Sequence, residues 1–165
     1  MKLTDRYLLV LNKNDQKRVL SAMRECAKLW NDLIDITQSE RKSGHWITDV
    51  EMQKLVQSQY NLHSDTITAL CQRMYANIKT ALELRKENPK IEFPYIKKEL
   101  VTIDGKKKQV LKGNYISLNK SVKIKVSEEV DLSTTNLFHI VTHGNSFYIF
   151  VTREQKEPKL RQEGE

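Results

Sequence analysis

The sequence predicts an α+β fold in which a three-helix insertion follows the first strand of a small antiparallel β-barrel or sheet. Residues 13–88 carry apolar side chains at helical spacing, whereas the segment after Pro89 alternates apolar and polar side chains as strands do. The apolar run at 7–12 precedes the helices, so its strand partners must lie beyond residue 90. The predicted regions are a first barrel strand at 1–12, a helical lobe at 13–88, basic barrel strands at 89–153 and a polar tail or linker at 154–165.

Three helices are expected in the inserted region. Asp15 is a suitable N-cap for the first helix, and Gly44 can end it. Thr48 and Glu51 have the spacing of a capping box, which predicts a shorter second helix. Stripes with spacings of three and four residues mark the first and third helices, at Val19, Met23, Cys26, Trp30, Leu33 and Thr37 and at Ile67, Leu70, Cys71, Met74, Ile78 and Leu82.

Strands are expected after the helices. Pro94, within IEFPYIKK, excludes both a helix interior and a central strand at that point. Residues 115–119 and 122–126 alternate with a period of two, and residues 137–153 form a predicted hairpin around His143-Gly144-Asn145-Ser146. The GKKK stretch at 105–108 is typical of a charged, solvent-exposed turn.

Positive charge is concentrated in the middle of the chain. The formal net charge of the 165 residues is +7, and between Arg85 and Lys125 twelve lysines and arginines face four acids, a net of +8. This distribution indicates one surface that binds a polyanion, with nucleic acid as the expected class. A solvated lysine-rich loop is the alternative interpretation.

Several chemistries are not expected. No apolar run approaches the ~18 residues that a membrane span needs. Cys26 and Cys71 lie on helical stripes, which predicts buried thiols in a reducing, cytoplasmic compartment. The histidines at 45, 63, 139 and 143 are dispersed and no acidic cluster has metal-ligand spacing, so neither a metal nor a cofactor is expected.

Collinear segments resemble one protein family. They are YLLVLNKNDQ with Leu11 and Gln16, Trp30-Asn31, LHSDTIT at 62–68, FPYIKK at 93–98, residues 116–118 and the hairpin at 140–149. Their order resembles the N-terminal half of TnpB, the insertion-sequence-associated, RNA-guided nucleases related to type V CRISPR effectors. The resemblance implies a wedge-like β-barrel with the helices inserted as a recognition lobe. The chain departs from the family pattern at Lys13, Asp65, Ile96 and Thr68.

The resemblance also implies where DNA is bound. In the family the start of the third helix and a neighbouring barrel segment lie against the short DNA motif that flanks the target. The matching residues here are Ser64, Asp65, Thr68, Lys112, Gly113 and Asn114. Hydroxyls and an amide can hydrogen-bond to base edges, and a helix N-terminus favours a phosphate. For Ser64 and Asp65, helix capping alone is the alternative.

The basic segment is expected to hold the backbone of a guide RNA scaffold or of a heteroduplex through charge and A-form shape. Tyr95 can stack on a base, although packing within the barrel is an equal alternative. The predicted RNA-binding residues are Lys90, Tyr95, Lys97, Lys98, Lys106, Lys107, Lys108, Lys120, Lys123 and Lys125.

The nuclease half of the family would follow Glu165, so we expect no catalytic residues in this chain. The resemblance implies a structured guide RNA and a target double-stranded DNA as partners. Where the nuclease half lies is open: it could be a separate chain that acts as a further partner, or it could have been lost by truncation. Two other interpretations stay open. A shortened relative could act as a regulator or inhibitor by binding guide RNA or an effector, and the chain could be a protein-interaction domain.

Overall fold

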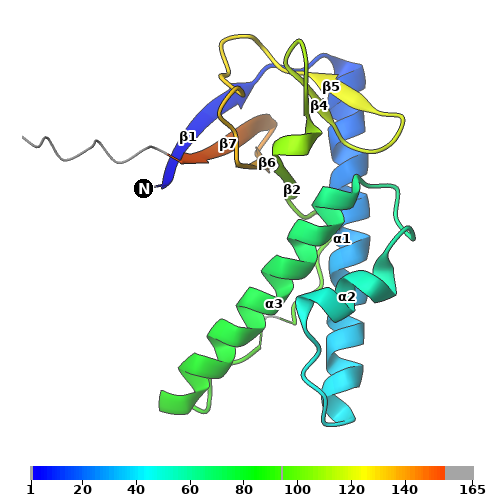
Figure 1. Cartoon of the computed structure of the whole chain (residues 1–165), viewed down its shortest axis with the longest axis vertical. Coiled ribbons are helices and arrows are strands. Elements are labelled where there is room, and N and C mark those ends of the chain that lie inside the picture. Colours follow the sequence, from blue (N-terminus) through cyan, green and yellow to red (C-terminus); the bar gives the residue numbers. More distant parts are fainter. Residues whose placement is uncertain (1, 94, 155–165) are drawn as a thin grey trace, which may run out of the picture.

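The computed structural model describes residues 2–93 and 95–154, so the predicted tail at 155–165 lies outside the described residues. The strands gather at one end of the molecule, and the helices extend away from them (Figure 1). The elements are β1 (Lys2–Leu9), α1 (Lys13–Lys42), α2 (Asp49–Val56), α3 (Ser64–Glu87), β2 (Ile103–Lys106), a 3₁₀ turn (Lys107–Gln109), β3 (Val110–Leu111), β4 (Tyr115–Ser117), β5 (Lys123–Lys125), β6 (Leu137–His143) and β7 (Ser146–Glu154).

The described strands form two antiparallel sheets. One has the order β1-β7-β6-β2 and the other the order β3-β4-β5. The predicted α+β class, with three helices inserted after the first strand, is confirmed. The first strand does pair beyond residue 90, because β1 runs alongside β7 from Lys2↔Glu154 to Leu9↔Phe147. The prediction allowed either a barrel or a sheet, and the hydrogen-bonded strands form two separate sheets.

The boundary between the first strand and the first helix was predicted wrongly. The strand covers residues 2–9 instead of 7–12, because β7 offers a partner position to every residue of this range. Asn12 is the N-cap of α1, since its side-chain oxygen accepts a hydrogen bond of 2.8 Å from the backbone N–H of Asp15. Asp15 is a buried residue of the first turn, where its carboxylate pairs with Arg18 at 2.8 Å.

The predicted exposed turn at 105–108 was also wrong in its first half. Gly105 and Lys106 belong to β2, which pairs with β6. Gly105 lies directly against the ring of Phe138, and the space that a Cβ would need is occupied by that ring. Only Lys107 and Lys108 are exposed in the turn that follows. A glycine within a lysine-rich stretch thus marks close packing.

Three local predictions are confirmed. Gly44, with φ +81°, follows the end of α1 at Lys42. Thr48 forms the capping box of α2 together with Glu51. In the β6–β7 hairpin His143 pairs with Ser146, and Gly144 takes the positive φ of +63° at the turn.

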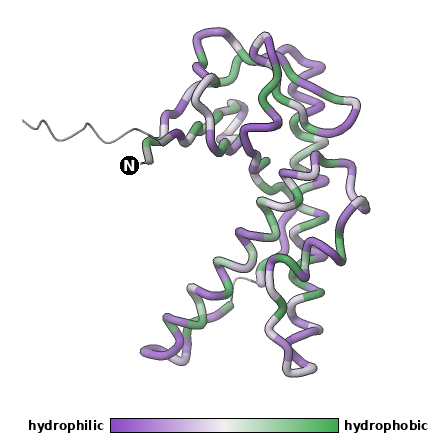
Figure 2. The backbone as a smooth tube through the Cα atoms, viewed as in Figure 1, coloured by the Kyte–Doolittle hydropathy of each residue, from purple (hydrophilic) through white to green (hydrophobic). Residues whose placement is uncertain are grey.

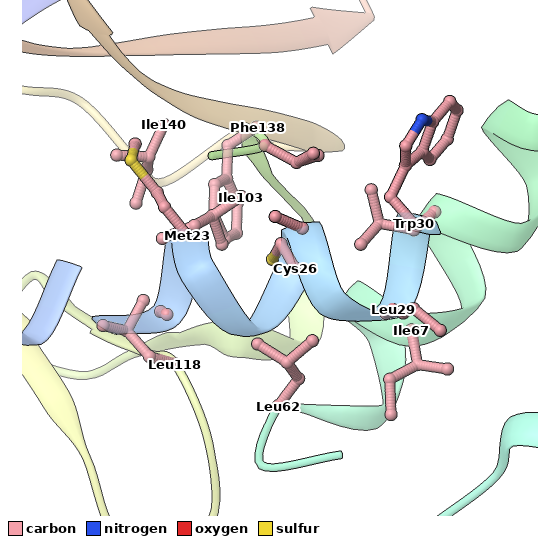
Figure 3. Packing of buried hydrophobic residues seen from close by; sticks show 14 of the residues in the cluster. Met23, Cys26, Leu29, Trp30, Leu62, Ile67, Ile103, Leu118, Phe138 and Ile140 are labelled. Carbon is pink, nitrogen blue, oxygen red and sulfur yellow. The ribbon is translucent and has the colours of Figure 1, made fainter. Parts of the chain in front are cut away.

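The hydrophobic core is one cluster that extends over the three helices and both sheets. Apolar and hydrophilic residues alternate along the helices and strands (Figure 2), as expected for elements with one buried face. Met23 and Cys26 of α1 pack near Ile103 and Phe138, all of them at most 1% exposed (Figure 3). Trp30, predicted as a core residue, is 2% exposed. The core therefore fixes the helical lobe to the larger sheet.

Candidate nucleic-acid interface

The first turn of α3 is capped by His63 instead of the predicted Ser64 or Asp65. The backbone N–H of Asp65 donates to Nδ1 of His63 at 3.0 Å. The backbone N–H of His63 donates in turn to the carbonyl oxygen of Leu118 at 2.9 Å, which ties the cap to the end of β4. Because Nδ1 accepts, a neutral His63 ring carries its proton on Nε2. The hydroxyl of Ser64 is not used by the cap and is exposed.

A buried glutamine holds α3 against the smaller sheet. Gln109 is 0% exposed, and its Nε2 donates to Oγ1 of Thr66 at 2.9 Å and to the carbonyl of Ser117 at 3.0 Å. Its Oε1 accepts from the backbone N–H of Lys106 at 3.1 Å. One side chain therefore joins the first turn of α3, the end of β4 and the end of β2. Nothing in the local sequence marks Gln109 as buried, so its role could not be predicted from sequence.

A cleft opens between α2, the first turn of α3 and the β4–β5 turn. Its volume is about 700 Å³. Among its lining residues the ionisable side chains are Lys54, Tyr60, His63 and Lys120, and none is a carboxylate. Ser64 and Thr68 line it, whereas Asp65 does not. The other lining residues are Val50, Gln53, Gln57, Ser58, Asn61, Leu62, Ile67, Ser117 and Asn119.

The predicted DNA-contact residues are divided between two places. Ser64 and Thr68 lie beside the end of β4, whereas residues 112–114 form the turn before it. Four extended residues from Asn114 to Leu118 span roughly 13 Å. Nδ2 of Asn114 donates to the carbonyls of Ser127 and Val130, both at 2.9 Å, so this amide secures a loop.

The 112–114 turn has a backbone and surroundings of its own. Gly113 and Asn114 have positive φ values of 81° and 62°. Both line a smaller cleft of about 300 Å³, where Glu128 and Asp131 contribute negative charge. Carboxylates repel phosphate, so this smaller cleft is a poorer nucleic-acid site than the cleft beside α3.

Two lysines lie beside Tyr115 on the smaller sheet, and Lys112 is exposed in the turn before it. We call Lys112, Tyr115, Lys123 and Lys125 the basic strand patch. Nζ of Lys123 lies 4.7 Å from the Tyr115 ring centroid, and Nζ of Lys125 lies 4.9 Å from it. Both lysines are exposed while Ile124 between them is buried, and Lys125 donates to the carbonyl of Gly113. None of the three lysines forms an ion pair with another described residue, so their charge faces solvent.

None of the remaining predicted lysines belongs to this patch. Lys97 pairs with Asp35 at 3.0 Å, and Nζ of Lys98 lies 5.7 Å from the Trp30 ring, so both follow α1. Lys106 donates to Gln72 at 3.2 Å, and Lys90 is exposed beyond the end of α3. Lys120 lines the larger cleft, and Lys107 and Lys108 are exposed.

Tyr95 is half-buried within an aromatic group. Its ring stacks on Phe93 with centroids 5.6 Å apart, and its hydroxyl is buried without a partner among the described residues. Trp46 contacts the other side of this group, at 5.6 Å from Phe93. The ring of Tyr95 is thus already packed.

A buried carboxylate joins α3 to the larger sheet, and no role for it was predicted beyond its charge. Asp104 is 3% exposed and contacts Nδ1 of His139 at 2.8 Å, Oγ1 of Thr102 at 2.9 Å and the guanidinium of Arg73 at 3.4 Å. Burial alone would raise the pKa of Asp104. The hydrogen bond and charge of His139, together with Arg73 and Thr102, outweigh burial and hold that pKa below its usual value. The sequence signal that could have identified Asp104 is an acid that directly follows the apolar Ile103 in VTIDG.

The cysteines and histidines have structural surroundings. Burial raises the pKa of the Cys71 thiol to about 12 and that of Cys26 further, as expected for inert thiols. His45 contacts Glu51 at 2.8 Å. Within residues 2–93 and 95–154, no group of three or more His, Cys, Asp or Glu side chains is arranged to hold a metal ion. Over the same residues, no helix has the length and apolar character needed to cross a membrane.

No protein-family model matches the chain, and no curated protein sequence matches it significantly.

Proposed function

We propose that this chain is the RNA-binding and DNA-flanking-motif-recognising module of a TnpB-like, RNA-guided DNA-targeting system, and that it works in the cytoplasm without a nuclease centre of its own. The observation that carries the proposal is the basic strand patch beside a cleft without carboxylates. β4 connects the two, because Tyr115 belongs to the patch and Ser117 lines the cleft.

The basic strand patch supports binding of an RNA backbone. Lys123 and Lys125 stand on the same face of β5, with their Cα atoms roughly 6.6 Å apart. Neither lysine is neutralised by a described carboxylate, so each can approach a separate phosphate and release its counterions. Recognition of this kind depends on charge and on the shape of the RNA helix. The target sequence is then recognised by base pairing with the guide RNA.

The larger cleft supports the DNA contact. Ser64 and Thr68 supply hydroxyls, and a neutral His63 supplies a ring N–H donor that can reach a base edge. Lys120 adds a cation for the backbone. Asp65 and Asn114 do not carry the proposal, because Asp65 lies outside the cleft lining and the amide nitrogen of Asn114 is already engaged.

The first test is sequencing of the RNA that co-purifies with the protein from its native host. One enriched, structured RNA is expected, whereas bulk ribosomal and transfer RNA, or none, would contradict a guide-binding role. The presence of bound RNA would also distinguish an RNA-binding module from a protein-interaction domain, which is expected to carry none.

The second test locates the binding surface. We expect Lys123→Glu with Lys125→Glu to weaken binding of that RNA and to flatten the slope of log K against log salt by about 1.5. The matched control is Lys42→Glu with Lys79→Glu, which makes the same charge change on the helical lobe. Equal losses from both pairs would show a general charge effect and would contradict the assignment to the patch.

A further inference from the structure

One face of the larger sheet carries an ordered set of aromatic and basic side chains that no part of the proposed function uses. Residues paired across an antiparallel sheet point to the same side. The register pairs Leu8 with Tyr148 and Tyr148 with Val141. The next row contains Arg6, Phe150, His139 and Asp104.

This face points away from the core. The alternate residues of the same strands, including Phe138, Ile140 and Ile149, are 0% exposed and belong to the core cluster. Val141, Tyr148 and Phe150 are only partly buried and do not belong to that cluster. We call the side that bears Arg6, His139, Tyr148 and Phe150 the open face.

Positive charge predominates on the open face. Arg6 is exposed, and its guanidinium carbon lies 4.2 Å from the centroid of the Tyr148 ring. Lys106 stands two residues from Asp104 on β2 and so points to the same side. Among the described side chains of this face the only carboxylate is Asp104, which is buried and bound to His139, Thr102 and Arg73. The face is therefore complementary to a polyanion.

We propose that the open face binds single-stranded nucleic acid, with unpaired bases stacked on Tyr148 and Phe150. These rings lie two residues apart on β7, a central strand of the sheet, at roughly 6.8 Å between Cα atoms. Aromatic rings on an antiparallel sheet accept bases of any sequence, because every base has a π-face. Arg6 extends the stacking surface at Tyr148 and provides a cation for the adjacent phosphate.

His139 contributes a fixed contact on the other side of Phe150. Asp104 holds Nδ1 of its ring at 2.8 Å, which leaves Nε2 for the ligand. The side chain of His139 is 42% exposed, so this nitrogen is within reach of a phosphate or a sugar. Arg6 and His139 thus stand on either side of Phe150 in one row of the sheet.

This inference goes beyond the proposed function, because it assigns a different surface and a different ligand, an unpaired strand instead of structured RNA or duplex DNA. It does not require a guide RNA. Either proposal can fail while the other stands.

The test uses the full chain and fluorescently labelled 12-mers of oligo(U) and oligo(dT), each in an intact form and in a form with four central abasic sites. Both forms carry the same phosphates, so only the intact form can stack. We expect abasic oligomers to bind the wild-type protein about 5- to 150-fold more weakly for each stacked base that is lost. If intact oligo(U) binds more tightly than intact oligo(dT), the ligand is assigned to single-stranded RNA. If the two bind equally, the open face accepts single strands of both RNA and DNA.

Variants then locate the stacking. Tyr148→Ala with Phe150→Ala should remove the difference between intact and abasic oligomers, whereas Tyr148→Phe with Phe150→Tyr should keep it. Lys42→Glu with Lys79→Glu, on the helical lobe, should also keep it. The proposal is overturned if the wild-type protein binds intact and abasic oligomers equally, a result that needs no variant to fold, or binds neither. It is equally overturned if the double alanine variant, shown to be folded by circular dichroism, keeps the full preference.

Discussion

Gln109 provides the sharpest test of how α3 is positioned. We expect Gln109→Leu, which nearly conserves volume, to leave Oγ1 of Thr66, the carbonyl of Ser117 and the backbone N–H of Lys106 without their partner. An unpaired buried polar group costs about 1–3 kcal/mol. Thr66 is 0% exposed, whereas Ser117 and Lys106 are partly exposed, so we expect one full penalty and two smaller ones of about 0.5 kcal/mol each. The free energy of unfolding should fall by about 2–4 kcal/mol.

Urea denaturation followed by circular dichroism measures this loss, provided that the m-value is unchanged. The matched control is Gln72→Leu, because Gln72 also accepts from Lys106 but is exposed. It should cost less than about 0.5 kcal/mol. In a double-mutant cycle, Thr66→Val and Gln109→Leu should be coupled by about 0.5–2 kcal/mol. A loss for Gln109→Leu no larger than that of the control would refute the reasoning.

Three further predictions concern stability. The pKa of Asp104 is lowered in the fold, so its ionised form stabilises the protein fully above the unfolded pKa of about 3.9. This contribution is lost as the pH falls through the lower folded value. The gap in urea midpoint between wild type and Asp104→Asn should therefore be present above about pH 4 and close as the pH falls further; a gap that persists at lower pH would contradict the assignment. His63→Ala should cost about 1 kcal/mol of unfolding free energy and His63→Asn little, because asparagine restores the N-cap; equal losses would contradict the cap. Gly105→Ala should lower the thermal midpoint through overlap with Phe138, at about 1–3 kcal/mol, and Phe138→Leu should partly rescue it; additive effects would exclude that contact as the cause.

Features encoded within a few residues were predictable from the sequence. The capping box of Thr48 and Glu51 and the hairpin turn at Gly144 each depend on adjacent residues, so local chemistry was sufficient to place them. The helical stripe through Cys26 and Trp30 was equally clear, because its period repeats over many turns.

Features that require distant segments to meet were not predictable. β2 has only four residues, among them a glycine and a lysine, and it becomes a strand because β6 lies alongside it. The burial of Gln109 depends on three elements that converge from separate parts of the chain. For the site, the sequence indicated Ser64 and Thr68, but whether they share a cleft with Lys120 depended on where the β4–β5 turn lies.

The open face was also predictable only in part. Alternation along residues 137–153 already indicated two sides of a hairpin. Which side faces solvent, and that Arg6 stands beside Phe150, follow only from β7 lying between β1 and β6.

The pairing of β1 with β7 also has a consequence for how the protein is made. Thr4 and Thr152, whose hydroxyls lie 3.3 Å apart, are separated by 148 positions along the chain. On the ribosome, β1 emerges first and has no partner until the hairpin has been synthesised, whereas the helices can form and pack in the meantime. An unpaired apolar strand is prone to join other chains. Completion of the larger sheet is therefore the expected slow step of folding, and the nascent protein is expected to be most prone to aggregation before that step.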